Sequence, residues 1–165
     1  MATVQISSDA GLGSGTVVSP DGWVLTNHHV VDDEGQLLQD GVYISFTQDL
    51  SRAPIQVAEA EVVEADAELD LALLRIKRDI LGRELAAGLR LPFTPMGTPE
   101  ELRHGEQLII AGYPSVGGDE SRSSISVTRG VVSGMTVAPD GSWTWIKTDA
   151  RINAGNSGGS MFNAS

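Results

Sequence analysis

The sequence contains no cysteine among its 165 residues. Disulfide bonds, thiolate catalysis and cysteine-based zinc or iron–sulfur sites are therefore excluded. Basic residues are also scarce, because 11 Lys and Arg stand against 22 Asp and Glu, for a formal net charge of −11. Nucleic-acid binding needs a basic stripe along the phosphates, and an anionic membrane surface attracts cationic segments. The charge balance argues against both partners, and we interpret it as a source of solubility.

Long apolar runs are missing as well. No stretch approaches the roughly 18 residues that a membrane span requires, so we expect no membrane insertion by this chain. Residues 1–5 have neither the basic nor the apolar character of a signal peptide, and the sequence predicts none. Nucleotide-loop, zinc-peptidase and EF-hand patterns do not occur either, so we expect no cofactor and no metal.

What the sequence does contain is a series of short apolar runs between turn residues. Val42–Thr47 alternates apolar and polar side chains, which is typical of a half-buried strand. Leu71–Ile76 is nearly all apolar, which predicts a strand covered on both faces. The predicted strands are Thr16–Ser19, Trp23–Thr26, Val42–Thr47, Ile55–Ala60, Leu71–Ile76, Leu108–Gly112, Ser124–Val132 and Trp143–Thr148. Regularly spaced short strands favour an all-β sandwich or barrel.

Turn and linker signals divide the chain. Pro-Asp-Gly triplets at residues 20–22 and 139–141 predict hairpin turns, because Pro presets the first torsion and Gly accepts a positive φ. Helical signal is thin, and the capping box at residues 98–101 opens at most a turn or two. We expect an N-terminal β-rich half over residues 1–77, a linker over 78–105 and a C-terminal half over 106–165.

Ser157, within the segment Gly155–Gly159, is the candidate nucleophile. Small neighbours let a substrate approach, and glycine torsions can aim successive N–H groups at one point as an oxyanion hole. Taken alone, the segment fits a surface turn about equally well. It also fits the G-x-S-x-G elbow of α/β-hydrolases, in which the acid and the histidine follow the serine. No His, Asp or Glu follows Ser157, so that fold is rejected.

The opposite order, His then Asp then Ser, is present. His28 and His29 end a hydrophobic strand after a hairpin, where a rigid support can hold a side chain over a cleft. Asp70 lies among apolar residues, and a buried carboxylate needs a partner, of which an imidazole is one example. A turn-capping role is the other interpretation of Asp70, and Asp66 or Glu68 fits that role equally well.

Together these segments resemble the trypsin-like serine peptidases and, within them, the HtrA/Deg family. The resemblance is carried by G-S-G-T-V-V at 13–18, D-G-W-V-L-T-N-H-H-V-V at 21–31, D-L-A-L-L at 70–74 and T-D-A-R-I-N-A-G-N-S-G-G at 148–159. It implies an all-β fold of two antiparallel, six-stranded-type β-barrels, the chymotrypsin fold. Only eight residues follow Ser157, so we expect the second barrel to be incomplete at its C-terminal end.

The resemblance also implies a role for individual residues. His29 would be the general base, Asp70 its orienting acid and Ser157 the nucleophile. Gly155, Asn156 and Ser157 would form the oxyanion hole, with the N–H groups of the first and last as donors. The implied chemistry is acyl transfer through an acyl-enzyme, without metal or cofactor.

Five other residues carry weaker interpretations. We expect His28 to be a neighbour of the base and His104 to lie on the surface. Arg151, six residues before the nucleophile, either favours an acidic substrate side chain or points to solvent. Trp143 and Trp145 share one face of a predicted strand, which indicates packing rather than a ligand platform.

The sequence therefore predicts a serine endopeptidase acting on polypeptides, unfolded proteins among them. The resemblance suggests a homotrimer and an extracytoplasmic location, either periplasmic, secreted or membrane-tethered. The alternative is a catalytically silent or incomplete protease-like domain that serves as a binding module or is a truncated domain, since family strands that follow the nucleophile lie beyond this chain. The intact set of His29, Asp70 and Ser157 favours the enzyme.

Overall fold

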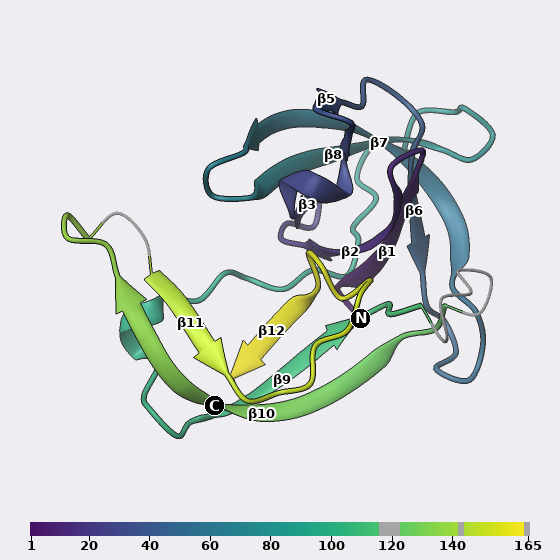
Figure 1. The fold of residues 1–165 in the computed structure, drawn as a ribbon. Coiled ribbons are helices and arrows are strands. Elements are labelled where there is room, and N and C mark those ends of the chain that lie inside the picture. Colours follow the sequence, from purple (N-terminus) through teal and green to yellow (C-terminus); the bar gives the residue numbers. More distant parts are fainter. Residues whose placement is uncertain (116–122, 142–143, 164–165) are drawn as a thin grey trace.

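A computed structural model describes residues 1–115, 123–141 and 144–163. Figure 1 shows a barrel formed by about the first half of the chain and a sheet formed by its C-terminal part. The strands are β1 Thr3–Ser8, β2 Gly11–Val17, β3 Trp23–Thr26, β4 Asp32–Asp33, β5 Gln36–Leu37, β6 Val42–Phe46, β7 Ile55–Asp66, β8 Leu71–Asp79, β9 Gln107–Gly112, β10 Ser126–Val137, β11 Thr144–Thr148 and β12 Ser160–Asn163. Two single 3₁₀ turns accompany them, η1 His28–Val30 and η2 Pro99–Glu101.

The N-terminal barrel closes in the order β1-β2-β3-β8-β7-β6, with antiparallel neighbours. Alternate side chains point inward, so Val4, Ile44 and Leu74 are fully buried in one apolar core. Strand β8 follows the same alternation, with Leu74 inside and Leu71 39% exposed. The prediction that Leu71–Ile76 is covered on both faces is therefore wrong, because the outer surface of a barrel faces solvent.

The C-terminal part forms an open four-stranded sheet in the order β11-β10-β9-β12. Strand β12 follows the loop of Ser157 and pairs antiparallel with β9, from Ser160 opposite Ala111 to Asn163 opposite Leu108. The all-β fold class, with a closed first barrel and a partial second one, is confirmed.

Some of the predicted turns and strands are observed, and others differ from the structure. Both Pro-Asp-Gly hairpins form, with φ of +98° at Gly22 and +75° at Gly141. Residues 98–101 form only η2, and Thr98 makes no side-chain cap bond to it. Strands β1, β4, β5 and β12 were not among the predicted strands, while β10 starts two residues later than predicted and continues to Val137. Trp143 lies outside the described residues, and Trp145 is 54% exposed.

A seam of buried and partly buried hydroxyl groups joins the barrel to the sheet. Ser160 Oγ accepts a hydrogen bond from Thr3 Oγ1 at 2.9 Å and shares a second one with Thr16 Oγ1 at 2.7 Å. The Tyr113 hydroxyl lies 2.8 Å from Thr47 Oγ1. Because hydrogen bonds are directional, this seam sets the register in which the sheet meets the barrel. Ser160 is buried, and its hydroxyl finds both of its partners in this seam.

Candidate active site

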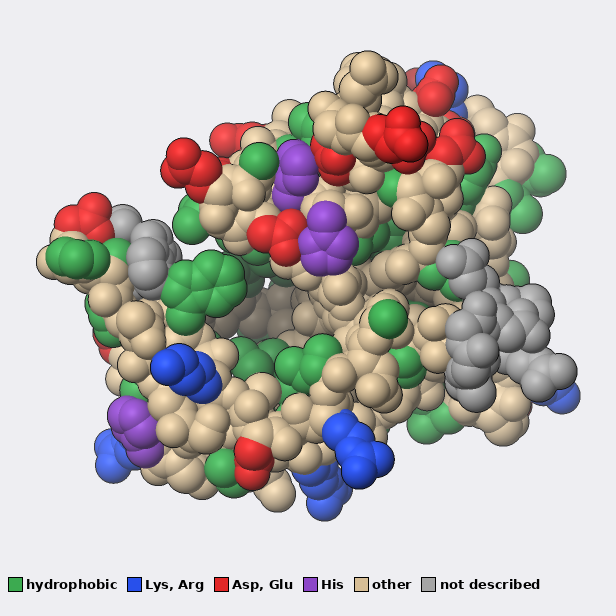
Figure 2. All heavy atoms as spheres, in the orientation of Figure 1, with side chains coloured by type: hydrophobic (Ala, Val, Ile, Leu, Met, Phe, Trp, Pro, Cys, Tyr) green, Lys and Arg blue, Asp and Glu red, His purple; other side chains and the backbone are tan. Residues whose placement is uncertain are grey.

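His29 lies on the η1 turn, directly after β3. The turn is anchored by Val30, which is buried against β2 at a point where a Cβ on Gly13 would lie 2.6 Å from Val30 Cγ1. A glycine at position 13 is thus required for the turn to pack this closely. Anchored in this way, η1 leaves the His29 side chain 56% exposed at the border between barrel and sheet. Figure 2 shows histidine side chains on this border, next to acidic ones.

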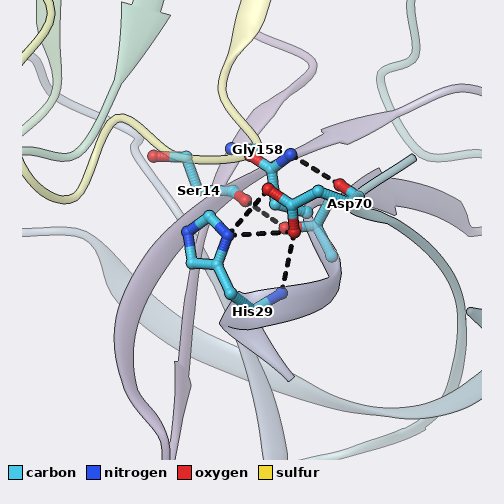
Figure 3. A network of polar contacts seen from close by, with 6 residues as sticks. Ser14, His29, Asp70 and Gly158 are labelled. Carbon is cyan, nitrogen blue, oxygen red and sulfur yellow. Dashed lines mark hydrogen bonds and ion pairs between the residues drawn. The ribbon is translucent and has the colours of Figure 1, made fainter. Parts of the chain in front are cut away.

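Asp70 lies in the turn between β7 and β8, and its side chain contacts His29. Its backbone is left-handed, with φ of +51°, a region that Asp tolerates better than most residues. The His29 Nδ1 atom lies 3.0 Å and 2.9 Å from the two carboxylate oxygens, and the His29 backbone N–H donates to Oδ1 at 3.1 Å. Figure 3 shows the imidazole directed at the carboxylate. This contact leaves the Nε2 atom on the far side of the ring free of the acid.

The capping role that was the other interpretation of Asp70 belongs to Asp66. Its Oδ1 atom accepts hydrogen bonds from the N–H groups of Glu68 at 2.9 Å and Leu69 at 3.0 Å. Asp70 itself is not the buried carboxylate that its apolar neighbours predicted, since its side chain is 40% exposed. The left-handed turn carries it toward His29 and away from the barrel core.

Ser14 of β2 holds the Ser157 loop against the barrel. Its backbone N–H donates to Ser157 O at 2.8 Å, and its hydroxyl donates to Gly155 O at 2.6 Å. The same hydroxyl accepts a hydrogen bond from the Tyr113 N–H at 2.8 Å. Ser14 is fully buried, so these bonds are shielded from water. The loop that carries the predicted nucleophile is therefore held by hydrogen bonds to the N-terminal barrel as well as by its connection to its own sheet.

Two glycines shape the loop by adopting positive φ, +92° at Gly155 and +77° at Gly158. Asn156 O accepts a hydrogen bond from Gly159 N–H at 2.8 Å. Since a trans peptide directs its C=O and N–H oppositely, this bond turns the N–H of Ser157 away from Gly159. Among the hydrogen bonds of the described residues, neither the Gly155 nor the Ser157 N–H is a donor.

The structure brings the predicted residues together to different extents. His29 and Asp70 are in direct contact, whereas no hydrogen bond within the described part of the chain joins Ser157 Oγ to His29. The Ser157 loop is linked to the pair through Asn27, whose Oδ1 accepts from Gly158 N–H at 2.6 Å. Figure 3 shows Gly158 beside the His29–Asp70 pair.

Sequence reasoning assigned no role to Ser14 or Asn27. Both lie in segments that carry the family resemblance, and a serine between two glycines at the start of a strand was an unused signal for Ser14. His104 is exposed as expected. Arg151 is exposed as well, and its carbonyl accepts a hydrogen bond from Thr128 Oγ1 at 3.2 Å.

A hollow of about 710 Å³ lies elsewhere, between β7, β8 and the segment 84–91. Its lining includes Arg75 and Lys77, which are paired with Asp21 at 2.6 Å and Glu61 at 2.7 Å. None of its lining residues is a histidine or one of the predicted site residues. Across the described residues, no group of three His, Asp or Glu side chains is placed to hold a metal ion. The candidate site is therefore the region around His29.

Comparisons with known proteins point the same way. The model of the trypsin-like peptidase domain matches residues 13–165. The chain is 38% identical over 154 residues to a probable periplasmic serine endoprotease DegP-like of Pseudomonas putida (strain GB-1), covering 92% of this chain and 27% of that protein. A protein of the same description from Marinomonas sp. (strain MWYL1) is 34% identical over 164 residues, covering 98% of this chain and 29% of that protein.

The fold is also similar to the crystal structure of the serine endoprotease from Yersinia pestis. The TM-score is 0.66 at 29% identity, and the match covers 98% of this chain and 49% of that one. The chain thus spans roughly a quarter of the length of the curated relatives it matches.

Proposed function

Because the chain belongs to the trypsin-like peptidases, with DegP-like endoproteases among its relatives, we propose that it is the catalytic part of a serine endopeptidase. Its substrates would be polypeptides, unfolded proteins among them. The observation that carries this proposal is the contact between His29 and Asp70, two residues 41 positions apart in the sequence. A carboxylate on Nδ1 selects the tautomer in which Nε2 can accept a proton.

In the first half of the proposed reaction, His29 Nε2 takes the proton of Ser157 Oγ as that oxygen attacks the scissile carbonyl carbon. The negative charge moves to the carbonyl oxygen, where the N–H groups of Gly155 and Ser157 donate hydrogen bonds. Asp70 stabilises the imidazolium. The C–N bond then breaks, the leaving amine takes the proton from Nε2, and an ester to Ser157 remains.

In the second half, water replaces the amine. Nε2 takes a proton from the water as its oxygen attacks the ester carbon, and the same two N–H groups receive the oxyanion. Collapse of the intermediate returns the proton to Ser157 Oγ and releases the carboxylic acid product. The exposure of the His29 and Asp70 side chains, 56% and 40%, gives water a direct route to the base.

A second function is favoured by one observation. Within the described residues Ser157 Oγ makes no hydrogen bond to His29, as expected of a silent protease-like domain that only binds polypeptides. Catalytic hydrogen bonds of ligand-free enzymes are often long and tighten only when substrate binds, so this observation does not outweigh the His29–Asp70 contact.

Labelling with a fluorophosphonate probe, followed by mass spectrometry of the peptides, separates the two functions. We expect a single adduct on Ser157 and none in Ser157→Ala. A folded parent chain without adduct would reject the catalytic proposal and favour the binding module.

The two neighbouring histidines give an internal control. We expect His29→Ala to lower kcat/KM for peptide hydrolysis roughly 10⁴-fold or more, because no other group can take the serine proton. His28→Ala should leave the rate near that of the parent. Equal losses in the two variants would show that the base has been assigned to the wrong side chain.

The proposal extends to the arrangement and setting of the domain. Residues 1–77 supply the base and acid, 106–165 the nucleophile, and 78–105 the linker. The relatives are named as periplasmic, which supports an extracytoplasmic location, and no helix in the described residues is long and apolar enough to cross a membrane. The homotrimer implied by the resemblance is tested by sedimentation equilibrium, where a mass independent of concentration near 17.4 kDa would contradict it for this chain.

A further inference from the structure

Asn27 occupies the N-cap position of η1, with φ of −81° and ψ of 150°. Asparagine is favoured at such positions because its side-chain oxygen accepts a hydrogen bond from an N–H two or three residues later. Asn27 makes no such bond. The N–H of His29 is capped by Asp70 Oδ1 instead, at 3.1 Å. Because Asp70 Oδ1 already accepts the hydrogen bond from this N–H, the side-chain amide of Asn27 can bind other groups.

That amide bridges two loops that are far apart in the sequence. Its Oδ1 atom accepts from Gly158 N–H at 2.6 Å across 131 positions, and its Nδ2 atom donates to Asp70 O at 2.7 Å across 43 positions. Both partners have a positive φ, +77° and +51°. Such backbone needs support from its surroundings, above all at a residue with a Cβ. No other side chain in the described segments hydrogen-bonds both the Asp70 turn and the loop 155–159.

The bond to Gly158 acts on the peptide group that follows the predicted nucleophile. The carbonyl of this group, Ser157 O, accepts from Ser14 N–H at 2.8 Å, and its N–H donates to Asn27. A planar peptide held at both its C=O and its N–H cannot rotate about its long axis. The orientation of this peptide plane, on which the ψ torsion of Ser157 depends, is therefore held from both sides.

We propose that Asn27 is a positioning residue of the site: its amide ties the Gly158 end of the nucleophile loop to the Asp70 turn and so keeps Ser157 in register with His29. This inference rests on the proposed function of those two residues. Asn27 would raise the reaction rate by keeping Ser157 in place, because a misplacement of about 1 Å in a reacting group can cost about 100-fold in rate.

The bridge can be tested without any reactivity, by amide hydrogen exchange of Gly158 in the Ser157→Ala protein. We expect Asn27→Ala to speed this exchange about tenfold, which corresponds to the loss of one hydrogen bond. Asn27→Asp keeps the acceptor and should preserve the slow exchange. His28→Ala, the matched control on the same turn, retains the backbone bond from Val31 N–H to His28 O and should change nothing.

The positioning role is tested in the Ser157 protein, at a temperature well below unfolding. We expect Asn27→Ala to slow the reaction of Ser157 with the fluorophosphonate about 100-fold, and to lower kcat by a similar factor with KM near its parental value. A merely structural asparagine would lower the unfolding midpoint and leave the reactivity of each folded molecule intact.

The possible results of these experiments test the bridge, the positioning role and the proposed function separately. Unchanged Gly158 exchange in Asn27→Ala would overturn the bridge, whatever the activity of the parent. Faster exchange with undiminished Ser157 reactivity would overturn the positioning role. A parent chain that shows no adduct, together with faster exchange in Asn27→Ala, would reject the proposed function and retain the bridge.

Discussion

The N-terminal barrel encloses one continuous apolar core, whereas the described part of the C-terminal sheet buries fewer apolar side chains, among them Leu108, Tyr113 and Val132. Within the barrel, a continuous core contains side chains with no exposed surface, among them Ile6, Ile44 and Leu74. In the sheet, large apolar side chains stand about half exposed on β10 and β11, and Met161 of β12 is 41% exposed. An open groove of about 440 Å³ runs between the segment 94–102 and strands β9, β11 and β12. The barrel is a closed scaffold, whereas the sheet depends on it through the hydroxyl seam.

Charged residues are also distributed unequally between the barrel and the rest of the chain. Residues 1–79 contain 14 acidic and 4 basic side chains, while residues 80–165 contain 8 and 7. Figure 2 shows acidic side chains gathered over the barrel and most of the visible Lys and Arg over the sheet. A large net charge destabilises a compact unit through self-repulsion, so the barrel needs its closed core to offset this cost. From this comparison we expect the barrel to contribute more of the folding free energy than the sheet, while the nucleophile loop is held by hydrogen bonds to the barrel.

The largest effect is expected where that loop touches the barrel. A Cβ on Gly158 would overlap Ser14 O and Thr26 Oγ1, and its φ of +77° disfavours any other residue. We expect Gly158→Ala to displace the loop and to slow Ser157 labelling by at least about 100-fold. Gly88→Ala is the control, since Gly88 has a similar φ of +85° and open space around it.

Measuring the free energy of unfolding of both glycine variants in denaturant separates two costs. One is the steric overlap of the new Cβ, and the other is the strain of a positive φ. Gly88→Ala should lose only about 1–2 kcal/mol of unfolding free energy, the cost of a left-handed alanine, and keep the parental labelling rate. Equal labelling rates in the two variants would show that the loop does not depend on the barrel.

An intermediate effect is expected from truncating core side chains. Leu74→Ala removes a fully buried side chain from the barrel and should lower the free energy of unfolding by about 2–5 kcal/mol. Met161→Ala, in the sheet, should cost less than about 1 kcal/mol because its side chain is already partly in water. Urea unfolding followed by tryptophan fluorescence measures both. Similar losses would mean that the sheet contributes as much stability as the barrel.

The smallest effect concerns a single carboxyl group of the acidic barrel. A hydrogen bond from Ser19 Oγ at 2.5 Å, followed by one from Arg75 at 2.6 Å, lowers the pKa of Asp21 from its ordinary value of 3.8 to about 2. Because the folded pKa is depressed, the stabilisation is present above about pH 4 and is lost as the pH falls through about 2.

We therefore expect Ser19→Ala to raise the pKa of Asp21 toward 3.8, as measured by NMR titration of its carboxyl carbon. Asp49, whose pKa is lowered by Ser51, is an internal reference that should not move. An unchanged pKa for Asp21 would assign the shift to Arg75 alone.

Periodicity predicted the elements in which local pattern and burial agree. Strand β3 was predicted with its observed bounds, and both Pro-Asp-Gly turns form, because these features need only neighbours in the sequence. Strand β1 was not predicted, although Val4 and Ile6 alternate with polar residues along it. Asp70 was expected to be buried, but its apolar neighbours alternate between the two faces of the barrel wall while the turn directs its side chain elsewhere.

By itself, the sequence determined the all-β class, the hairpins and, through its motifs, the family and the short set of residues able to do chemistry. Tertiary structure alone decided which of them meet. The pairing of His29 with Asp70, the choice of Asp66 as the turn cap, and the contacts of Ser14 and Asn27 with the Ser157 loop all join distant positions. Hydrogen bonds depend on distances of a few tenths of an ångström and on direction, and barrel closure sets both.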